Sequence, residues 1–124
     1  MHQSDKMKVI VSCGGTGGHI FPAIAIADSL KSRYPDAEIR FVGAKGRMEM
    51  EKVPAAGYTI IGLPVRGYQR RFTFQNLSFF YKLFVSILRA RKLIRTFNPD
   101  IAVGVGGFAS GPLLRSAARA GVPT

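Results

Sequence analysis

Glycine is concentrated in one short segment near the amino end of the chain, where four glycines flank a single threonine. The segment comprises Gly14, Gly15, Thr16, Gly17 and Gly18. A glycine-rich connection between a strand and a helix lets the backbone adopt positive φ angles and lets a ligand approach the main chain closely. The N–H groups that open the next helix then form an anion site, to which Thr16 adds a hydroxyl. The pattern favours a phosphate-binding loop over a simple tight turn.

A histidine, His19, follows these glycines where the loop passes into the predicted helix. A histidine beside a bound phosphate can act as a general base, or it can hold a reacting hydroxyl by a hydrogen bond. A histidine at the start of a helix also has a purely structural interpretation, and spacing alone leaves the two open. His19 is the candidate catalytic residue of this chain.

A second glycine-rich segment follows the last predicted strand and precedes the last predicted helix. Its glycines and serine are Gly104, Gly106, Gly107 and Ser110. The Ser110 hydroxyl has two interpretations, a contact to the ligand or a cap for the helix. Two such loops at the ends of neighbouring strands predict one site for a ligand that carries more than one phosphate.

Two familiar nucleotide-binding patterns fit the first loop poorly. A P-loop requires a lysine followed by Ser or Thr, and residues 14–19 contain no lysine. A dinucleotide fingerprint requires a glycine at the position of Ile20 and an acidic residue after the second strand, where residues 43–45 read Gly-Ala-Lys. A nicotinamide site is therefore a disfavoured alternative.

Strands and helices alternate along the chain with compact connections. Strands are predicted at residues 8–12, 38–42, 58–62 and 100–103, and helices at 22–33, 46–55, 77–97 and 109–120. This alternation is typical of an α/β fold, a Rossmann-like doubly wound parallel sheet. Residues 1–7 are expected to be a disordered leader, residues 8–124 one domain, and residues 122–124 the opening of a fifth strand. Such sheets bind ligands at the carboxyl ends of their strands, where both glycine loops fall.

The composition narrows the classes of function. The formal net charge is +11, from 18 Lys and Arg against seven Asp and Glu, which predicts an anionic partner. Cys13 is the only cysteine and there are two histidines, so an internal disulfide framework and a Cys- or His-rich metal site are excluded. The chain has no apolar stretch of membrane-spanning length.

The middle of the chain is basic and aromatic. No acidic residue occurs between Lys52 and Pro99, and that segment holds nine cations. They are Lys52, Arg66, Arg70, Arg71, Lys82, Arg89, Arg91, Lys92 and Arg95.

Helical spacing sorts the apolar residues of 77–97 into two stripes. The first stripe, expected to face the sheet, is Phe80, Leu83, Ile87, Ala90 and Ile94. The second is Leu77, Tyr81, Phe84 and Leu88, with Lys82, Arg89, Arg91 and Arg95 around or beyond it. A crossover helix needs one apolar stripe, so the second predicts a contact with an anionic membrane surface. A covering helix or loop and a nucleic-acid surface are the alternatives, and nucleic acid is disfavoured because no recognised binding motif is present.

Taken together, these residues resemble the MurG family of peptidoglycan glycosyltransferases. The resemblance covers essentially the whole chain after residue 7. It rests on GGTGGH at 14–19 followed by Phe21 and Pro22, on RME at 47–49, and on NPD at 98–100 running into GVGGFASGP at 104–112.

The resemblance implies half of a GT-B enzyme, in which two Rossmann-like domains enclose the active site. On that reading, residues 8–124 are most of the N-terminal, acceptor-side domain. The C-terminal donor domain is absent, and this chain alone is expected to be inactive.

The implied reaction transfers N-acetylglucosamine from UDP-GlcNAc to the MurNAc 4-hydroxyl of lipid I, undecaprenyl-pyrophosphoryl-MurNAc-pentapeptide, with inversion, to give lipid II. The two loops would bind the acceptor pyrophosphate, residues 16–18 would border the donor, and His19 would activate or orient the hydroxyl. No metal and no cofactor are implied. The second stripe would hold the enzyme peripherally on the cytoplasmic face of the bacterial inner membrane, against the anionic leaflet. The alternatives are a related GT-B enzyme with another lipid acceptor and a nicotinamide-binding domain.

Overall fold

Four parallel strands alternate with four helices in the structure, a computed structural model, which confirms the predicted doubly wound α/β fold. The structure describes residues 6–13, 17–64, 74–106 and 110–124, and the side chains of these except at 17–19 and 74–79. The strands are β1 (Lys8–Ser12), β2 (Glu38–Ala44), β3 (Thr59–Leu63) and β4 (Ile101–Gly104). The helices are α1 (Gly17–Arg33), α2 (Glu49–Ala55), α3 (Phe74–Phe97) and α4 (Ser110–Arg119).

The sheet has the order β3-β2-β1-β4. The chain first moves outward from β1 through β2 to β3, and α3 then carries it back across to β4 on the other side of β1. The strand order therefore reverses between β1 and β4, and open α/β sheets bind ligands at the carboxyl ends of the strands at such a point. Ser12 pairs with Gly104 there, at the ends of the two strands.

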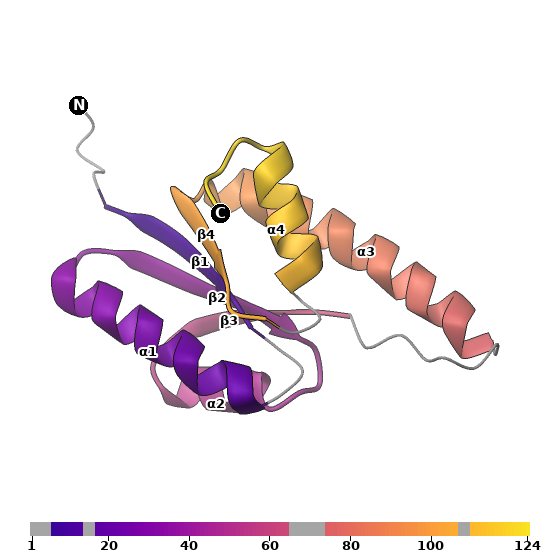
Figure 1. Cartoon of the computed structure of the whole chain (residues 1–124), viewed down its shortest axis with the longest axis horizontal. Coiled ribbons are helices and arrows are strands. Elements are labelled where there is room, and N and C mark those ends of the chain that lie inside the picture. Colours follow the sequence, from indigo (N-terminus) through magenta and orange to yellow (C-terminus); the bar gives the residue numbers. More distant parts are fainter. Residues whose placement is uncertain (1–5, 14–16, 65–73, 107–109) are drawn as a thin grey trace.

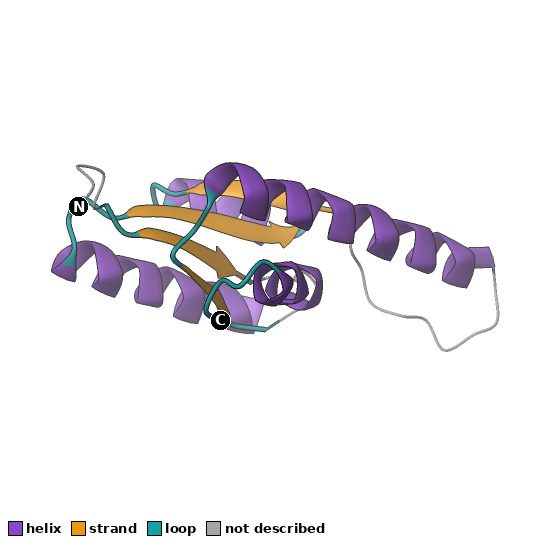
Figure 2. Ribbon diagram, turned by 90° about the horizontal axis from the view of Figure 1, so that it is seen from above, coloured by secondary structure: helices purple, strands orange, loops and turns teal. Residues whose placement is uncertain are grey.

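Helices cover both faces of the sheet, as Figures 1 and 2 show. Alternate residues of β1 face opposite ways, as a pleated strand requires. Val9 and Val11 belong to a buried cluster with α1 and α2, whereas Ile10 belongs to a second buried cluster with α3 and α4. The result is a three-layer arrangement whose β1 is buried on both faces.

The long helix α3 extends well beyond the sheet (Figure 1). Its residues in the core are Ala90, Leu93, Ile94 and Phe97, all in the carboxyl-terminal third of the helix. Phe80 was expected to face the sheet, but this is wrong, because its side chain is 56% exposed. Among the described residues, no strand lies beneath the amino-terminal half of α3 (Figure 1). No helix in the described ranges is both long enough and apolar enough to cross a membrane.

Helix α1 begins earlier than predicted, at Gly17 instead of Pro22. Pro22 lies inside the helix, where its missing N–H removes one backbone hydrogen bond. Only one turn precedes it, so the helix tolerates the loss. The glycines of residues 17 and 18 thus belong to the first turn of a helix.

The two ends of the chain depart slightly from prediction. Residues 1–5 of the expected leader lie outside the described residues, and Met7 already accepts a hydrogen bond from the N–H of Glu38. Residues 122–124 are not assigned as a strand, yet the N–H of Ala102 donates to the carbonyl of Pro123 at 2.9 Å. That bond places Pro123 against the outer edge of β4, where a fifth strand was expected.

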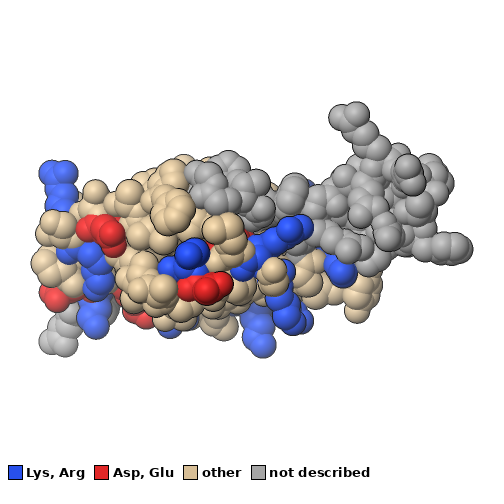
Figure 3. Space-filling view, turned by 90° about the horizontal axis from the view of Figure 1, so that it is seen from below, with Lys and Arg blue, Asp and Glu red and all other residues tan. Residues whose placement is uncertain are grey.

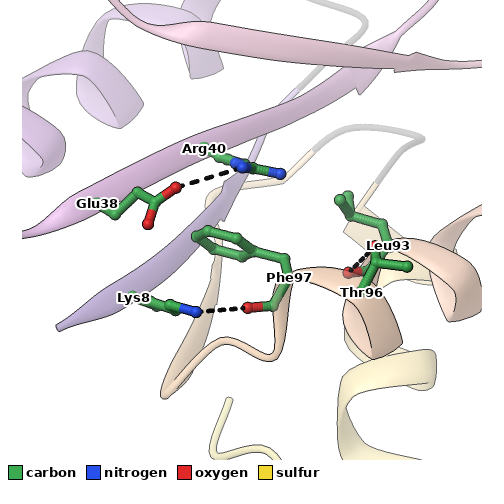
Figure 4. Close-up of polar contacts among 6 residues, drawn as sticks. All are labelled: Lys8, Glu38, Arg40, Leu93, Thr96 and Phe97. Atoms are coloured by element: carbon green, nitrogen blue, oxygen red, sulfur yellow. Dashed lines mark hydrogen bonds and ion pairs between the residues drawn. The ribbon is translucent and has the colours of Figure 1, made fainter. Parts of the chain in front are cut away.

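Phe97 anchors the end of α3 to the amino-terminal edge of the sheet (Figure 4). Its ring is 3% exposed, and the Arg40 guanidinium lies 4.4 Å from the ring centroid. The Lys8 ammonium donates to the Phe97 carbonyl at 3.4 Å. Glu38 forms an ion pair with Arg40 at 3.3 Å, which keeps the guanidinium in place over the ring. The side chains of β1 and β2 therefore fix where α3 ends.

We expect Phe97→Ala to lower the free energy of unfolding by about 3–5 kcal/mol, because it removes a buried aromatic side chain and leaves a cavity. Phe84→Ala is the matched control on the same helix, since Phe84 is 61% exposed, and it should change stability by less than about 0.5 kcal/mol. Urea denaturation followed by circular dichroism measures both. Equal losses for the two variants would contradict the anchoring role of Phe97.

Candidate functional site

The two glycine loops leave the sheet side by side. β1 and β4 are parallel neighbours, and their last residues, Ser12 and Gly104, are paired. The N–H of Val105 donates to the carbonyl of Ser12 at 2.9 Å, which continues the pairing one residue past the end of β4. The prediction that both loops lie at neighbouring strand ends is therefore confirmed.

A buried chain of hydroxyls joins the two connections. The Ser12 hydroxyl donates to the Ser110 hydroxyl at 2.9 Å, and Ser110 donates in turn to the carbonyl of Gly106 at 2.9 Å. Both serines are buried, at 0% and 7% exposure. Ser110 is the first residue of α4, and its hydroxyl takes part in both of these bonds. Its hydroxyl fixes the second glycine loop to the end of β1.

Two helix amino ends lie at this edge of the sheet, those of α1 and α4. Neither helix has an acidic residue in its first turn. The free N–H groups of a helix start carry a partial positive charge of roughly half a proton, which a nearby carboxylate would offset. Both ends are therefore electrostatically suited to phosphate groups.

The individual glycines of the site serve different purposes. Gly106 has a φ of 120°, a conformation that side chains rarely adopt. Gly104 has no such φ, but a Cβ there would lie 2.5 Å from Cδ1 of Leu114, so any larger residue would force the Leu114 side chain of α4 to shift. Gly17 and Gly18 form the first turn of α1. Gly14, Gly15, Thr16 and Gly107 lie outside the described residues.

His19 lies in the first turn of α1, at the same edge of the sheet. Its side chain is outside the described part of the structure, so the choice between a base and a positioning donor remains a prediction.

A buried glutamate beneath this edge was not among the predicted site residues. Glu49 is fully buried at the start of α2, and its Oε2 accepts a hydrogen bond from the N–H of Ala44 at 2.8 Å. A Cβ at Gly43 would lie 2.5 Å from Cγ of Glu49, so the end of β2 is shaped around this side chain. The one sequence feature that singled out Glu49 was its place in the RME motif. A glutamate in a polar segment is otherwise expected to be exposed.

Cys13 lies at the start of the first loop and is fully buried. Burial, and then the negative charge of Glu49, raises the pKa of the Cys13 thiol to about 11. The thiol is protonated at neutral pH and is therefore a poor nucleophile. Cys13 packs in the buried cluster that β1 forms with α1 and α2.

The residues of the second stripe are exposed where the structure describes them. Tyr81, Phe84 and Leu88 are 69%, 61% and 45% exposed, whereas the side chain of Leu77 is outside the described part. Lys82 is half-buried, and Arg89, Arg91 and Arg95 are exposed. Arg66, Arg70 and Arg71 also lie outside the described residues.

The charges of the two helical layers differ. Helices α3 and α4 carry seven Lys and Arg and no Asp or Glu, whereas α1 and α2 carry three of each sign. Figure 3, seen from the side of α1 and α2, shows the two signs interspersed. The net positive charge of the four helices therefore lies on the side of the sheet that α3 and α4 cover, which is also the side of the second stripe. Among the described residues, no group of three His, Cys, Asp or Glu is placed to hold a metal ion.

Residues 9–124 match the profile of the glycosyltransferase family 28 N-terminal domain. The chain is 56% identical, over its whole length, to the UDP-N-acetylglucosamine--N-acetylmuramyl-(pentapeptide) pyrophosphoryl-undecaprenol N-acetylglucosamine transferase of Cytophaga hutchinsonii, of which it covers 34%. It is 62% identical over 118 residues, 95% of this chain, to the protein of the same name from Parabacteroides distasonis, of which it covers 32%. The chain thus spans about a third of the length of these relatives.

Solved structures show the same fold. The crystal structure of Acinetobacter baumannii MurG matches 94% of this chain and 34% of its own, with a TM-score of 0.80 and 24% identity. The glycosyltransferase VinC, solved in complex with DTDP, matches 94% of this chain and 33% of its own, with a TM-score of 0.64 and 13% identity.

We expect the Ser12–Ser110 hydrogen bond to be detectable as a coupling energy. Ser110→Ala alone should cost about 1–3 kcal/mol, because it leaves the buried Ser12 hydroxyl without its acceptor. The double variant Ser12→Ala with Ser110→Ala should lose less than the sum of the single variants. Ser116→Ala is the control on the same helix, because the Ser116 hydroxyl is buried and has no hydrogen bond among the described residues. Additive losses for Ser12 and Ser110 would show that the two do not interact.

Proposed function

Since the chain belongs to the glycosyltransferase family 28 N-terminal domain family, we propose that it forms the acceptor-side half of an enzyme that transfers N-acetylglucosamine from UDP-GlcNAc to lipid I. The observation that carries the proposal is the junction of two glycine loops and two helix amino ends at the reversal of strand order. The names of the relatives, which are 55–62% identical to this chain, supply the substrates.

A diphosphate is the chemical group that this junction suits best. Each helix start offers N–H donors to one phosphate, and the Ser12–Ser110 bond ties the start of α4 to the end of β1, the strand that precedes α1. On this proposal the loops at 14–18 and 104–107 bind the pyrophosphate of lipid I, and residues 16–18 also border the donor. Ser110 is then a positioning residue, because its hydroxyl is already bonded within the chain.

His19 is proposed to act on the acceptor. It takes the proton from the MurNAc 4-hydroxyl while the oxygen forms a bond to the anomeric carbon of the donor sugar. The bond from that carbon to the diphosphate breaks at the same time, UDP departs with the electron pair, and the configuration inverts. General bases of this kind contribute about 10²–10⁴-fold to the rate. The departing diphosphate is stabilised by hydrogen bonds and a helix start, so no metal or cofactor enters the proposal.

The exposed stripe on α3 is proposed to hold the enzyme on the membrane that contains its lipid substrate. Tyr81, Phe84 and Leu88 are apolar side chains on a helix that carries five cations and no anion. Each cation near an anionic leaflet contributes roughly 1 kcal/mol. The enzyme is then peripheral, on the cytoplasmic face of the inner membrane, where UDP-GlcNAc is available. Nucleic acid is not a proposed partner.

The chain alone is proposed to be inactive, because the relatives are about three times as long and, on this proposal, most of the donor-binding residues lie in the remainder.

We expect the reading frame extended past Thr124 to transfer N-acetylglucosamine from UDP-GlcNAc to a lipid I analogue, and this chain alone to give no transfer. In the extended enzyme, His19→Ala should lower kcat by about 10²–10⁴-fold. The other histidine of the chain provides the matched control, since His2→Ala should leave kcat unchanged. Radiolabelled transfer, followed by chromatography of the lipid product, measures these rates.

Failure of a folded, extended enzyme to glycosylate lipid I would overturn the proposal, and glycosylation of a different lipid would identify a related acceptor. Turnover near that of the wild type in His19→Ala would remove His19 from the chemistry.

We expect Phe84→Ser with Leu88→Ser to weaken sedimentation with anionic vesicles by about tenfold or more, because burying each side chain contributes roughly 1.5–3 kcal/mol. These changes leave the net charge unaltered. Tyr34→Ser is the control, because Tyr34 is 43% exposed but lies after α1, away from the stripe. A loss of the same size in the control, or none in the stripe variant, would reject the membrane contact.

A further inference from the structure

A basic cavity lies between α3 and α4, near the carboxyl end of each. Its volume is about 410 Å³, and the residues that define its chemistry are Arg91, Arg95, Asn98, Ser116 and Arg119. Figure 1 shows α3 and α4 side by side, with the end of α4 above the end of α3.

This cavity is separate from the glycine loops. Those loops follow the carboxyl ends of β1 and β4, whereas α3 ends just before the amino end of β4, and the residues that follow α4 lie against β4 at Ala102. Val122, which follows α4, lines the cavity, and Asn98 precedes β4. The cavity and the candidate active site are therefore at opposite edges of the sheet.

The charge of the cavity favours an anion. Arg91, Arg95 and Arg119 have no ion pair among the described residues, where Arg40 and Glu38 form the one salt bridge. Cations near helix carboxyl ends offset the helix dipole, which gives Arg95 and Arg119 a structural role. However, each helix end carries only about half a negative charge. The three positive charges of the guanidinium groups exceed what the two helix ends together offset. Arg91 also precedes the last turn of α3 in the sequence, so it lies farther from that helix end than Arg95.

The polar groups of the cavity favour a phosphate. A guanidinium presents parallel N–H donors that match phosphate oxygens, which makes arginine the common choice for such ligands. Ser116 adds an independent observation, because its hydroxyl is buried and makes no hydrogen bond within the described chain. Buried hydroxyls are normally hydrogen-bonded, and an unpaired one suggests a missing partner. A small rotation of this side chain would offer the hydroxyl to an oxygen in the cavity that it lines.

We propose that this cavity binds the phosphate group of a ligand other than the two substrates, held by Arg91, Arg95 and Arg119 with Ser116 as a further donor. The ligand is a phosphate ester, either the headgroup of a membrane lipid or a soluble phosphate compound. The second stripe leads along α3 toward Arg91 and Arg95, which gives a lipid headgroup a direct approach. The proposal rests on none of the residues of the glycine loops.

The experiment titrates the chain with inorganic phosphate and with glycerol 3-phosphate at constant ionic strength, and follows heat by calorimetry. We expect saturable binding that Arg95→Gln with Arg119→Gln weakens by at least tenfold. Arg33→Gln with Arg115→Gln is the matched control, since it removes the same charge from α1 and α4 outside the cavity. Arg119→Lys should weaken binding less than Arg119→Gln, because it keeps the charge but loses the paired donors.

The source of the phosphate is identified by sedimentation with vesicles of phosphatidylglycerol and of phosphatidylcholine. Selective loss of phosphatidylglycerol binding in the Arg95 and Arg119 variant, with calorimetric binding as expected, supports the lipid headgroup. Unchanged vesicle binding with the same calorimetric result supports a soluble phosphate. No saturable binding of either phosphate, or equal losses in the cavity variant and its control, would overturn the proposal. Because GlcNAc transfer is not measured, failure here leaves the proposed function unaffected.

Discussion

The parallel pairing of β1 with β4 is the constraint on which the candidate site depends. These strands are separated by three helices and two strands in the sequence, and their register brings Ser12 opposite Gly104. The buried bond from Ser12 to Ser110 then ties the start of α4 to the end of β1. Without this pairing, each glycine loop would offer N–H groups to a single phosphate. With it, one edge of the sheet offers two helix starts to one ligand.

The fold also separates two kinds of surface. The edge at the carboxyl ends of β1 and β4 offers the backbone N–H groups of two helix starts, which suit phosphate without requiring a basic side chain. The cations are instead concentrated on α3 and α4, which together carry seven Lys and Arg and no Asp or Glu. On the proposed function, this division separates the groups that attract the anionic membrane surface from those that bind the substrate, so the two do not compete.

Much of the fold was predictable because its signals are local. Alternating strands and helices, with glycines after the first and last strands, indicate a doubly wound sheet, and the structure confirms it. The pairing of the two loops followed from topology, since parallel strands end at the same edge. The burial of Glu49 was not predicted, because it depends on contacts with Gly43 and Ala44. Helical spacing contains no information about such a contact.

The error at Phe80 has a geometric cause. Helical periodicity identifies which residues share a face, but not how far a sheet extends beneath that face. A helix of 24 residues is roughly 36 Å long, whereas strands of four to seven residues span only roughly 13–23 Å. The helix must therefore project past the strands, and Phe80 of the first stripe is exposed there together with Tyr81 and Phe84 of the second. The extra apolar surface follows from the mismatch in length, and the anchoring of Phe97 determines which end of α3 projects.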